Sequence, residues 1–297
     1  MEPVNTSYLP YILAGISIGG QYALIAIGYT MVYGILRLIN FAHGDIFMAA
    51  GLILINLCAI LPLWLAIALT VVITVLLGFV IERVAYKPLR SAPRMSVMIS
   101  AIGVSYLVQN LALYFTGGLA KTYPTIPWIS DTIDVFGSST KRVTVITPIL
   151  TLILIVLLML LIQKTKIGMA MRAVSKDFET SQLMGIPINS VISVTFIIGS
   201  LMAAIGSLLY FSNYPAVVPL SGAMPGLKAF VAAVFGGIGS IPGAVIGAFL
   251  IGICENLIKS GGSGWTNFSD AFTFVLLISI LLVRPSGLFG ETAADKV

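Results

Sequence analysis

The feature that most constrains this chain is a set of long stretches without a charged side chain. The longest lie between Glu2 and Arg37, Arg94 and Lys121, Arg142 and Lys164, and Glu179 and Lys228. Each can hold the roughly 20 apolar residues that a membrane-spanning helix needs. Hydrocarbon forces every backbone amide to bond within its own segment, and these stretches lack the alternating polarity of barrel strands. The chain is therefore predicted to be helical.

The composition is that of a membrane protein. Hydrophobic residues make up 58% of the chain and charged residues 9%, against about 25% charged residues in soluble domains. The first apolar stretch, from about Tyr8 to Leu36, is longer than the core of a cleaved signal peptide and is interpreted as a retained span. We predict an all-α integral membrane protein, one domain over 1–297, with about eight or nine helices, one or more of them discontinuous. Cys58 and Cys254 have neither disulfide nor metal-ligand spacing, so they are interpreted as packing residues and no metal is expected.

The positions of basic residues predict which connections are cytoplasmic. Spans are expected near 11–33, 46–61, 63–81, 96–115, 143–162, 190–211 and 271–283, with one or two more between 227 and 254. The connections 82–94 and 163–177 hold half of the 16 Lys and Arg residues, which places both in the cytoplasm. The connection between the fourth and fifth spans, which contains Pro124 and Trp128, is then external. Counting back puts the amino end outside, unless the second segment dips and returns. Because basic residues near helix ends orient the protein, the net charge of +5 does not indicate a nucleic acid partner.

The C-terminal third contains a break, "FGGIGSIPGA", inside an uncharged stretch. Ser240 can cap a new helix and Pro242 fits its first turn, so a short helix, a break and a second helix are expected. Gly239, Gly243 and Gly247 recur every four residues and predict a smooth stripe for close helix packing, or less readily a substrate contact.

Several classes of function are excluded or weakened. "GGIGSIPG" lacks the lysine of a phosphate-binding loop, so this chain is not expected to hydrolyse ATP. With one histidine and no paired carboxylates, an intramembrane enzyme is not expected. An ion-driven transporter needs ionisable groups at membrane depth. The candidates Asp45, Glu255 and Asp270 can each reach an interface.

A short amphipathic helix is predicted in the cytoplasmic loop at about 164–189. Asp177 begins a run in which Phe178, Leu183 and Met184 share an apolar side, and Gly185 ends it. Two interpretations are open: a helix on the membrane surface, or a helix that docks in the groove of a partner.

Several motifs resemble those of one transport family. "ETSQLMG", residues 179–185, is similar to the Glu-Ala-Ala-x-x-x-Gly loop of bacterial ABC importer permeases, with Thr180 and Ser181 in place of the alanines. "NFAHGD", "ERVAYKPLR", "ISAIG" and "LKAFVAAVFGGIGSIPGA" resemble, in order, blocks of the branched-chain amino acid permease family of the LivH type. The similarity runs from about Gly15 to Gly287.

The resemblance implies one permease subunit of an ATP-driven importer in the bacterial cytoplasmic (inner) membrane. Its expected partners are a second homologous permease, two cytoplasmic ATP-binding subunits, an external solute-binding protein and membrane lipid. ATP and Mg²⁺ would bind to those partners, and this chain would bind no cofactor. The cargo would be branched-chain amino acids, moved by alternating access. The alternatives are an importer of urea or short amides, or a self-sufficient secondary transporter or channel. The residues expected at the ATPase-docking surface are Arg172, Lys176, Asp177, Glu179, Leu183, Met184 and Gly185.

The polar cluster "INFAHGD" has three open interpretations. It is a cytoplasmic turn in which Asp45 caps the next helix, an interrupted helix that lines the transport route, or a pH sensor at His43. If it lines the route, Asn40 or His43 would bond to the solute. The candidates for the route are Gln21, Asn40, His43, Gln109 and Asn110.

Overall fold

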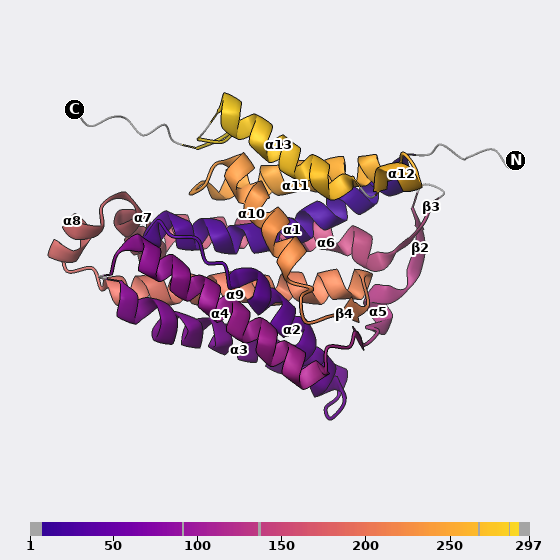
Figure 1. Cartoon of the computed structure of the whole chain (residues 1–297), viewed down its shortest axis with the longest axis horizontal. Helices are drawn as coiled ribbons and strands as arrows, with labels where there is room; N and C mark the ends of the chain where they lie inside the picture. The colour runs from indigo at the N-terminus through magenta and orange to yellow at the C-terminus, as the bar shows by residue number, and fades with distance from the viewer. Residues whose placement is uncertain (1–7, 91, 136–137, 267, 285, 291–297) are drawn as a thin grey trace, which may run out of the picture.

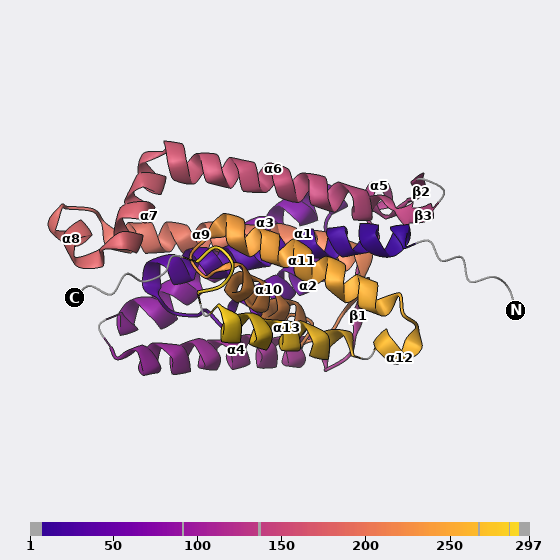
Figure 2. The same cartoon turned by 90° about the horizontal axis from the view of Figure 1, so that it is seen from above.

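A computed structural model describes residues 8–90, 92–135, 138–266, 268–284 and 286–290. The chain forms a bundle of helices that run roughly along one axis (Figure 1, Figure 2). Six apolar helical segments are long enough to cross a membrane, among the described residues. They correspond to α1 (Leu9–Leu36), α3 (Leu63–Ile81) with its continuation to Leu89, α4 (Arg94–Thr116), α6 (Arg142–Lys164), α9 (Ile188–Asn213) and α11 (Ile241–Lys259).

Three shorter apolar helices complete the bundle: α2 (His43–Cys58), α10 (Ala223–Gly236) and α13 (Ser269–Val283). Every predicted span corresponds to one of these nine helices. The predicted break in the C-terminal third separates α10 from α11. The all-α polytopic fold is therefore confirmed, and its helix number agrees with the prediction.

The two basic connections lie at one end of the bundle, which we call the basic end. The first contains the helical turns η1 (Glu82–Tyr86) and η2 (Lys87–Leu89), and the second contains α7 (Lys166–Lys176) and α8 (Phe178–Leu183). Arg37 donates to the Ser175 carbonyl at 3.1 Å, and Arg90 bonds to Asn189 at the start of α9. The two connections are thus joined to neighbouring helix ends, and they lie at the same end of the bundle, as the charge pattern predicts.

The opposite end holds the connection predicted to be external. It contains α5 (Pro127–Ser130) and a hairpin of β2 (Thr132–Val135) and β3 (Ser138–Lys141). The strand β1 (Lys121–Thr122) pairs antiparallel with β4 (Ala216–Val217), and the short helix α12 (Ser263–Thr266) also lies at this end (Figure 2). The helix α1 begins here, while residues 1–7 lie outside the described part of the chain.

The core of the bundle is built around α1 and α9, the most buried of the long helices, whereas α4 and α6 are the most exposed. Small residues let α1 approach α11 closely. A Cβ added to Gly15 would lie 2.8 Å from Ile253 Cα, and one added to Gly19 would lie 2.7 Å from Phe249 Cα. Such close approach of two backbones is the usual way in which membrane helices gain packing contacts.

Two of the short helices start inside the bundle and run in opposite directions. The helix α1 ends at Leu36; the next residue, Arg37, has a left-handed backbone (φ 55°), and residues 37–42 lead back to the start of α2. In the same way, residues 214–222 lead from the strand end of the bundle to the start of α10. The two starts touch, because a Cβ on Gly44 would lie 2.7 Å from the Gly222 carbonyl oxygen. The prediction of discontinuous helices is confirmed at α2 and α10.

The predicted caps and glycine contacts have mixed outcomes. Ser240 caps α11 by accepting from the Gly243 amide at 3.3 Å, as predicted. Asp45 is not a cap: the N-cap of α2 is Ala42, and the Asp45 side chain bonds to α4. Gly239 is also not part of the packing stripe, because α11 begins at Ile241 and Gly239 lies in the preceding turn with φ 97°.

The other two glycines of the stripe do make the predicted close contacts. A Cβ on Gly247 would lie 2.5 Å from the Ala232 carbonyl oxygen, and Gly243 lies against the backbone of Gly236. The two glycines therefore let α11 pack on α10.

Candidate functional site

A groove of about 300 Å³ opens where α2 and α10 begin. Its walls are mostly apolar side chains from α4, α10 and the segment that precedes α2. Backbone from both helix starts also lines it. The lining residues include Ile39, Phe41, Gly44, Ile102, Tyr106, Gly222, Gly226, Leu227 and Phe230. Discontinuous helices that meet inside the membrane are a recurrent way to build solute sites in transporters.

Three polar side chains form one wall of this groove. Asp45 lies in the first turn of α2 and is 3% exposed. Its carboxylate accepts from Ser105 Oγ at 2.5 Å and from Gln109 Nε2 at 2.9 Å, both on α4. The groove thus combines an apolar surface with one buried carboxylate, whose position is fixed by two neutral donors.

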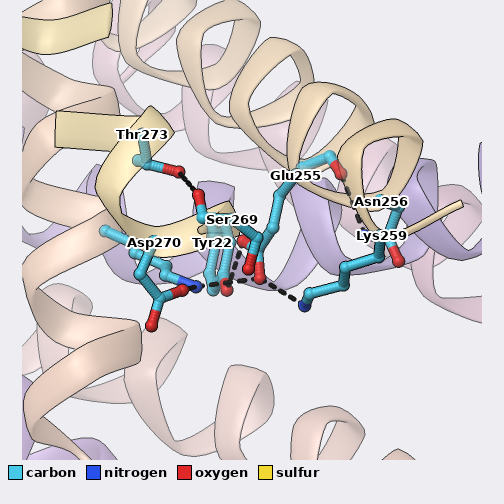
Figure 3. Close-up of polar contacts among 9 residues, drawn as sticks. Tyr22, Glu255, Asn256, Lys259, Ser269, Asp270 and Thr273 are labelled. Carbon is cyan, nitrogen blue, oxygen red and sulfur yellow. Dashed lines mark hydrogen bonds and ion pairs between the residues drawn. The ribbon is translucent and has the colours of Figure 1, made fainter. Parts of the chain in front are cut away.

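A second polar cluster lies on the other side of α10 and ties that helix to the rest of the bundle. Lys228 Nζ donates to Glu255 Oε1 at 2.8 Å and to Asp270 Oδ1 at 2.6 Å. Lys259 Nζ also reaches Glu255 Oε1 at 2.6 Å, and Tyr22 Oη donates to its other oxygen at 3.1 Å. Figure 3 shows Tyr22 and Lys259 reaching the Glu255 carboxylate, with Asp270 close by. The cluster borders a cavity of about 270 Å³.

Glu255 was expected to reach an interface, and the structure corrects this expectation. Its side chain is 2% exposed, and its charge is neutralised by Lys228, which is 5% exposed. Asp270 is about half exposed at the rim of the cluster, in agreement with the expectation. Since two lysines face two carboxylates, the cluster has no net charge. This neutrality is what makes the burial of charged groups tolerable.

At the basic end, α8 is held in a defined shape by its two caps. Asp177 accepts from the Thr180 amide at 3.0 Å and from Thr180 Oγ1 at 2.6 Å. After the helix, Gly185 has φ 80°, and the amides of Gly185 and Ile186 bond back to Gln182 and Ser181. This is the Schellman pattern that glycine permits. Two large apolar side chains nevertheless remain bare, because Leu183 is 88% exposed and Met184 is 78% exposed.

Hydrogen bonds link the basic end to the segment that leads to the groove. Tyr86 Oη donates to Asn40 Oδ1 at 2.7 Å. Nearby, the buried Glu82 accepts from Arg90, and from Ser193 Oγ at 2.8 Å. A cavity of about 260 Å³ beside these groups is lined by residues that include Tyr86, Arg90 and Phe178, the first residue of α8. The loop that contains α8 and the segment that precedes the groove are thus neighbours.

The candidate route residues occupy different places. Gln109 lines the groove. Gln21, Asn40 and His43 are buried among helices and do not line it. Asn110 is exposed, and its side chain donates to the Tyr106 carbonyl one turn earlier in its own helix.

Sequence reasoning missed two site residues, Ser105 and Lys228, for one reason. Ser105 is separated from its partner Asp45 by 60 positions, and Lys228 is separated from Glu255 by 27. Because each pair joins two different helices, the helical periodicity of the sequence cannot predict that these residues are in contact. The signal that did exist for Lys228 was its position: a lysine inside an apolar stretch needs a buried anion.

The fold and the groove define a class: a polytopic helical membrane protein with a polar site at the meeting point of two discontinuous helices, as in solute permeases. A family described as "Branched-chain amino acid transport system / permease component" matches residues 11–281, and the chain belongs to this family.

Its relatives include the high-affinity branched-chain amino acid transport system permease proteins LivH of Escherichia coli (strain K12), LivH of Salmonella typhimurium and BraD of Pseudomonas aeruginosa. They are 39%, 38% and 40% identical to this chain, and each alignment covers 98% of both proteins.

Proposed function

We propose that this chain is the transmembrane permease subunit of an ATP-driven (ABC) importer in the bacterial cytoplasmic membrane, and that it moves branched-chain amino acids by alternating access. The observation that carries the proposal is the similarity to three permease proteins of branched-chain amino acid transport systems over 98% of both chains. The groove supports it, because its surface suits an aliphatic solute.

Energy enters at the basic end through α8. Arg172, Lys176 and Glu179 are exposed around this helix, while Leu183 and Met184 present an apolar surface next to them. An apolar anchor surrounded by charges is what a helix needs to lie in a partner's groove. The partners are two cytoplasmic subunits that bind and hydrolyse ATP with Mg²⁺. Asp177 and Gly185 form the caps that keep the helix in shape.

Solute passes along the face that carries the groove. Asp45, Ser105 and Gln109 would be costly to expose to lipid, since polar groups facing hydrocarbon lose their hydration. A second, homologous permease subunit covers this face, so that the route runs between the two chains. An external solute-binding protein delivers the amino acid at the end of the bundle that holds the strands.

Reconstitution tests the proposal directly. The chain is co-expressed with its second permease and its ATPase subunits, and the purified complex is placed in proteoliposomes with the binding protein. We expect ATP-dependent uptake of leucine and no uptake of urea. Uptake of leucine by this chain alone, driven by an ion gradient, would contradict the proposal.

The variant Glu179→Lys serves as a docking test in the same system. We expect less ATPase subunit to co-purify with the variant than with the parent, at unchanged permease abundance. Equal co-purification would show that Glu179 is not a docking residue.

A further inference from the structure

Asp45 differs from the other buried carboxylates of the bundle. Glu255 is paired with Lys228 and Lys259, and Glu82 is paired with Arg90. None of the ion pairs among the described residues includes Asp45, although the residue is 3% exposed. Its two partners in α4 are neutral donors. A carboxylate that keeps its charge away from water needs a counter-charge, and the described part of the chain supplies none.

The surroundings of Asp45 indicate what the counter-charge is attached to. Ionised carboxylates accept about four hydrogen bonds, and Ser105 and Gln109 use two of them. The rest of the groove is largely apolar, with Ile102, Leu227 and Phe230 in its walls. A cation that fits here is compact, donates hydrogen bonds and carries an aliphatic chain.

We propose that Asp45 is the site that binds the ammonium group of the transported amino acid, with its aliphatic side chain lying in the groove between α4 and α10. The inference rests on the proposed function and adds the recognition chemistry within the permease itself. Ser105 and Gln109 are positioning residues that hold the carboxylate toward the groove. A charge-assisted bond to ammonium gives a preference for amines over carboxylic acids of the same shape.

A metal ion suits the site less well than an ammonium group. No group of three or more His, Cys, Asp or Glu side chains that could hold a metal occurs among the described residues. Hard cations prefer six or more oxygen ligands. An ammonium group needs only a few acceptors, which one carboxylate and nearby backbone oxygens can supply.

The test measures protection of a cysteine in the groove by small molecules. In the complete complex without its binding protein, Cys58 and Cys254 are replaced by alanine, and Ile102→Cys places a thiol in the groove. The rate of maleimide labelling is measured with leucine, with isoamylamine, which lacks the carboxylate, and with isocaproate, which lacks the ammonium. We expect leucine and isoamylamine to slow labelling and isocaproate not to. Equal protection by all three, protection by none, or no labelling at all would overturn the proposal.

The variant Asp45→Asn tests the residue itself. It keeps the size of the side chain and one acceptor oxygen but removes the charge, so the leucine concentration for half protection should rise about 10-fold or more. Asp134→Asn, at an exposed position in the β2–β3 hairpin, should leave it unchanged. Equal protection of Asp45→Asn and its parent would refute the assignment. If Asp45→Asn does not assemble into the complex, the assignment is tested by comparing how well leucine, isoamylamine and isocaproate protect the parent complex from labelling.

The two proposals fail in different ways. If the parent complex takes up leucine with ATP but isocaproate protects the groove as well as isoamylamine, the assignment of Asp45 is wrong and the importer function stands. If the parent complex does not take up leucine at all, the proposed function fails first.

Discussion

Replacing Lys228 with methionine should destabilise the protein through the charge balance of one buried cluster. Lys228 and Lys259 balance Glu255 and Asp270, and Lys228 contacts both carboxylates within 2.8 Å. Methionine preserves much of the apolar stem but leaves two carboxylates facing one lysine. The surplus negative charge falls mainly on Glu255, which is 2% exposed.

The size of the effect follows from burial. Removing one partner of a buried ion pair costs about 3–5 kcal/mol. Lys259 remains bonded to Glu255 and is 30% exposed, so we expect the lower part of that range, about 3 kcal/mol. Adding Glu255→Gln to Lys228→Met restores equal numbers of charges. The double variant should therefore be more stable than Lys228→Met, with a coupling of about 1–3 kcal/mol.

Thermal unfolding in detergent measures this prediction, with the parent, both single variants and the double variant compared under identical conditions. Lys164→Met, at an exposed position at the end of α6, is the matched control and should change stability by less than about 0.5 kcal/mol. The reasoning is refuted if Lys228→Met unfolds at the same temperature as the control, or if the double variant is less stable than the sum of the single effects predicts.

Two further predictions concern packing and docking. Gly28→Ala would place a methyl group against the imidazole of His43 and should lower stability by about 1–3 kcal/mol. Gly34→Ala, in the same helix, meets open space and should be neutral or stabilising in the same thermal unfolding experiments. Equal melting temperatures of the two variants would contradict this prediction. Leu183→Asp should reduce the amount of ATPase subunit that co-purifies with the permease at least several-fold. Ile60→Asp, at a position that is 82% exposed near the other end of the bundle, should not reduce it. A loss with both variants would point to general misfolding.

The positions of the helices could be predicted because they depend on local properties. Stretches without charge are long enough to span a membrane, and Ser240 with Pro242 marks the start of α11 as local capping chemistry requires. The basic residues likewise identified one end of the bundle. These features need no knowledge of which helices touch.

The prediction for Asp45 failed because a tertiary contact overrode a local preference. An aspartate at the start of a helix is a common cap, but here α4 supplies Ser105 and Gln109 to the same carboxylate. The four-residue spacing of Gly239 failed for a related reason. A spacing indicates a helix face only where the helix exists, and α11 begins after Gly239.

The most direct test of the central claim is to find which protein touches α8 in the working complex. A photo-crosslinking amino acid is placed at Leu183, where the side chain is 88% exposed, and the complex is irradiated in proteoliposomes. If this face receives the energy of ATP hydrolysis, the permease will crosslink to the ATPase subunit. A crosslink to the solute-binding protein instead, with none to the ATPase, would contradict the account.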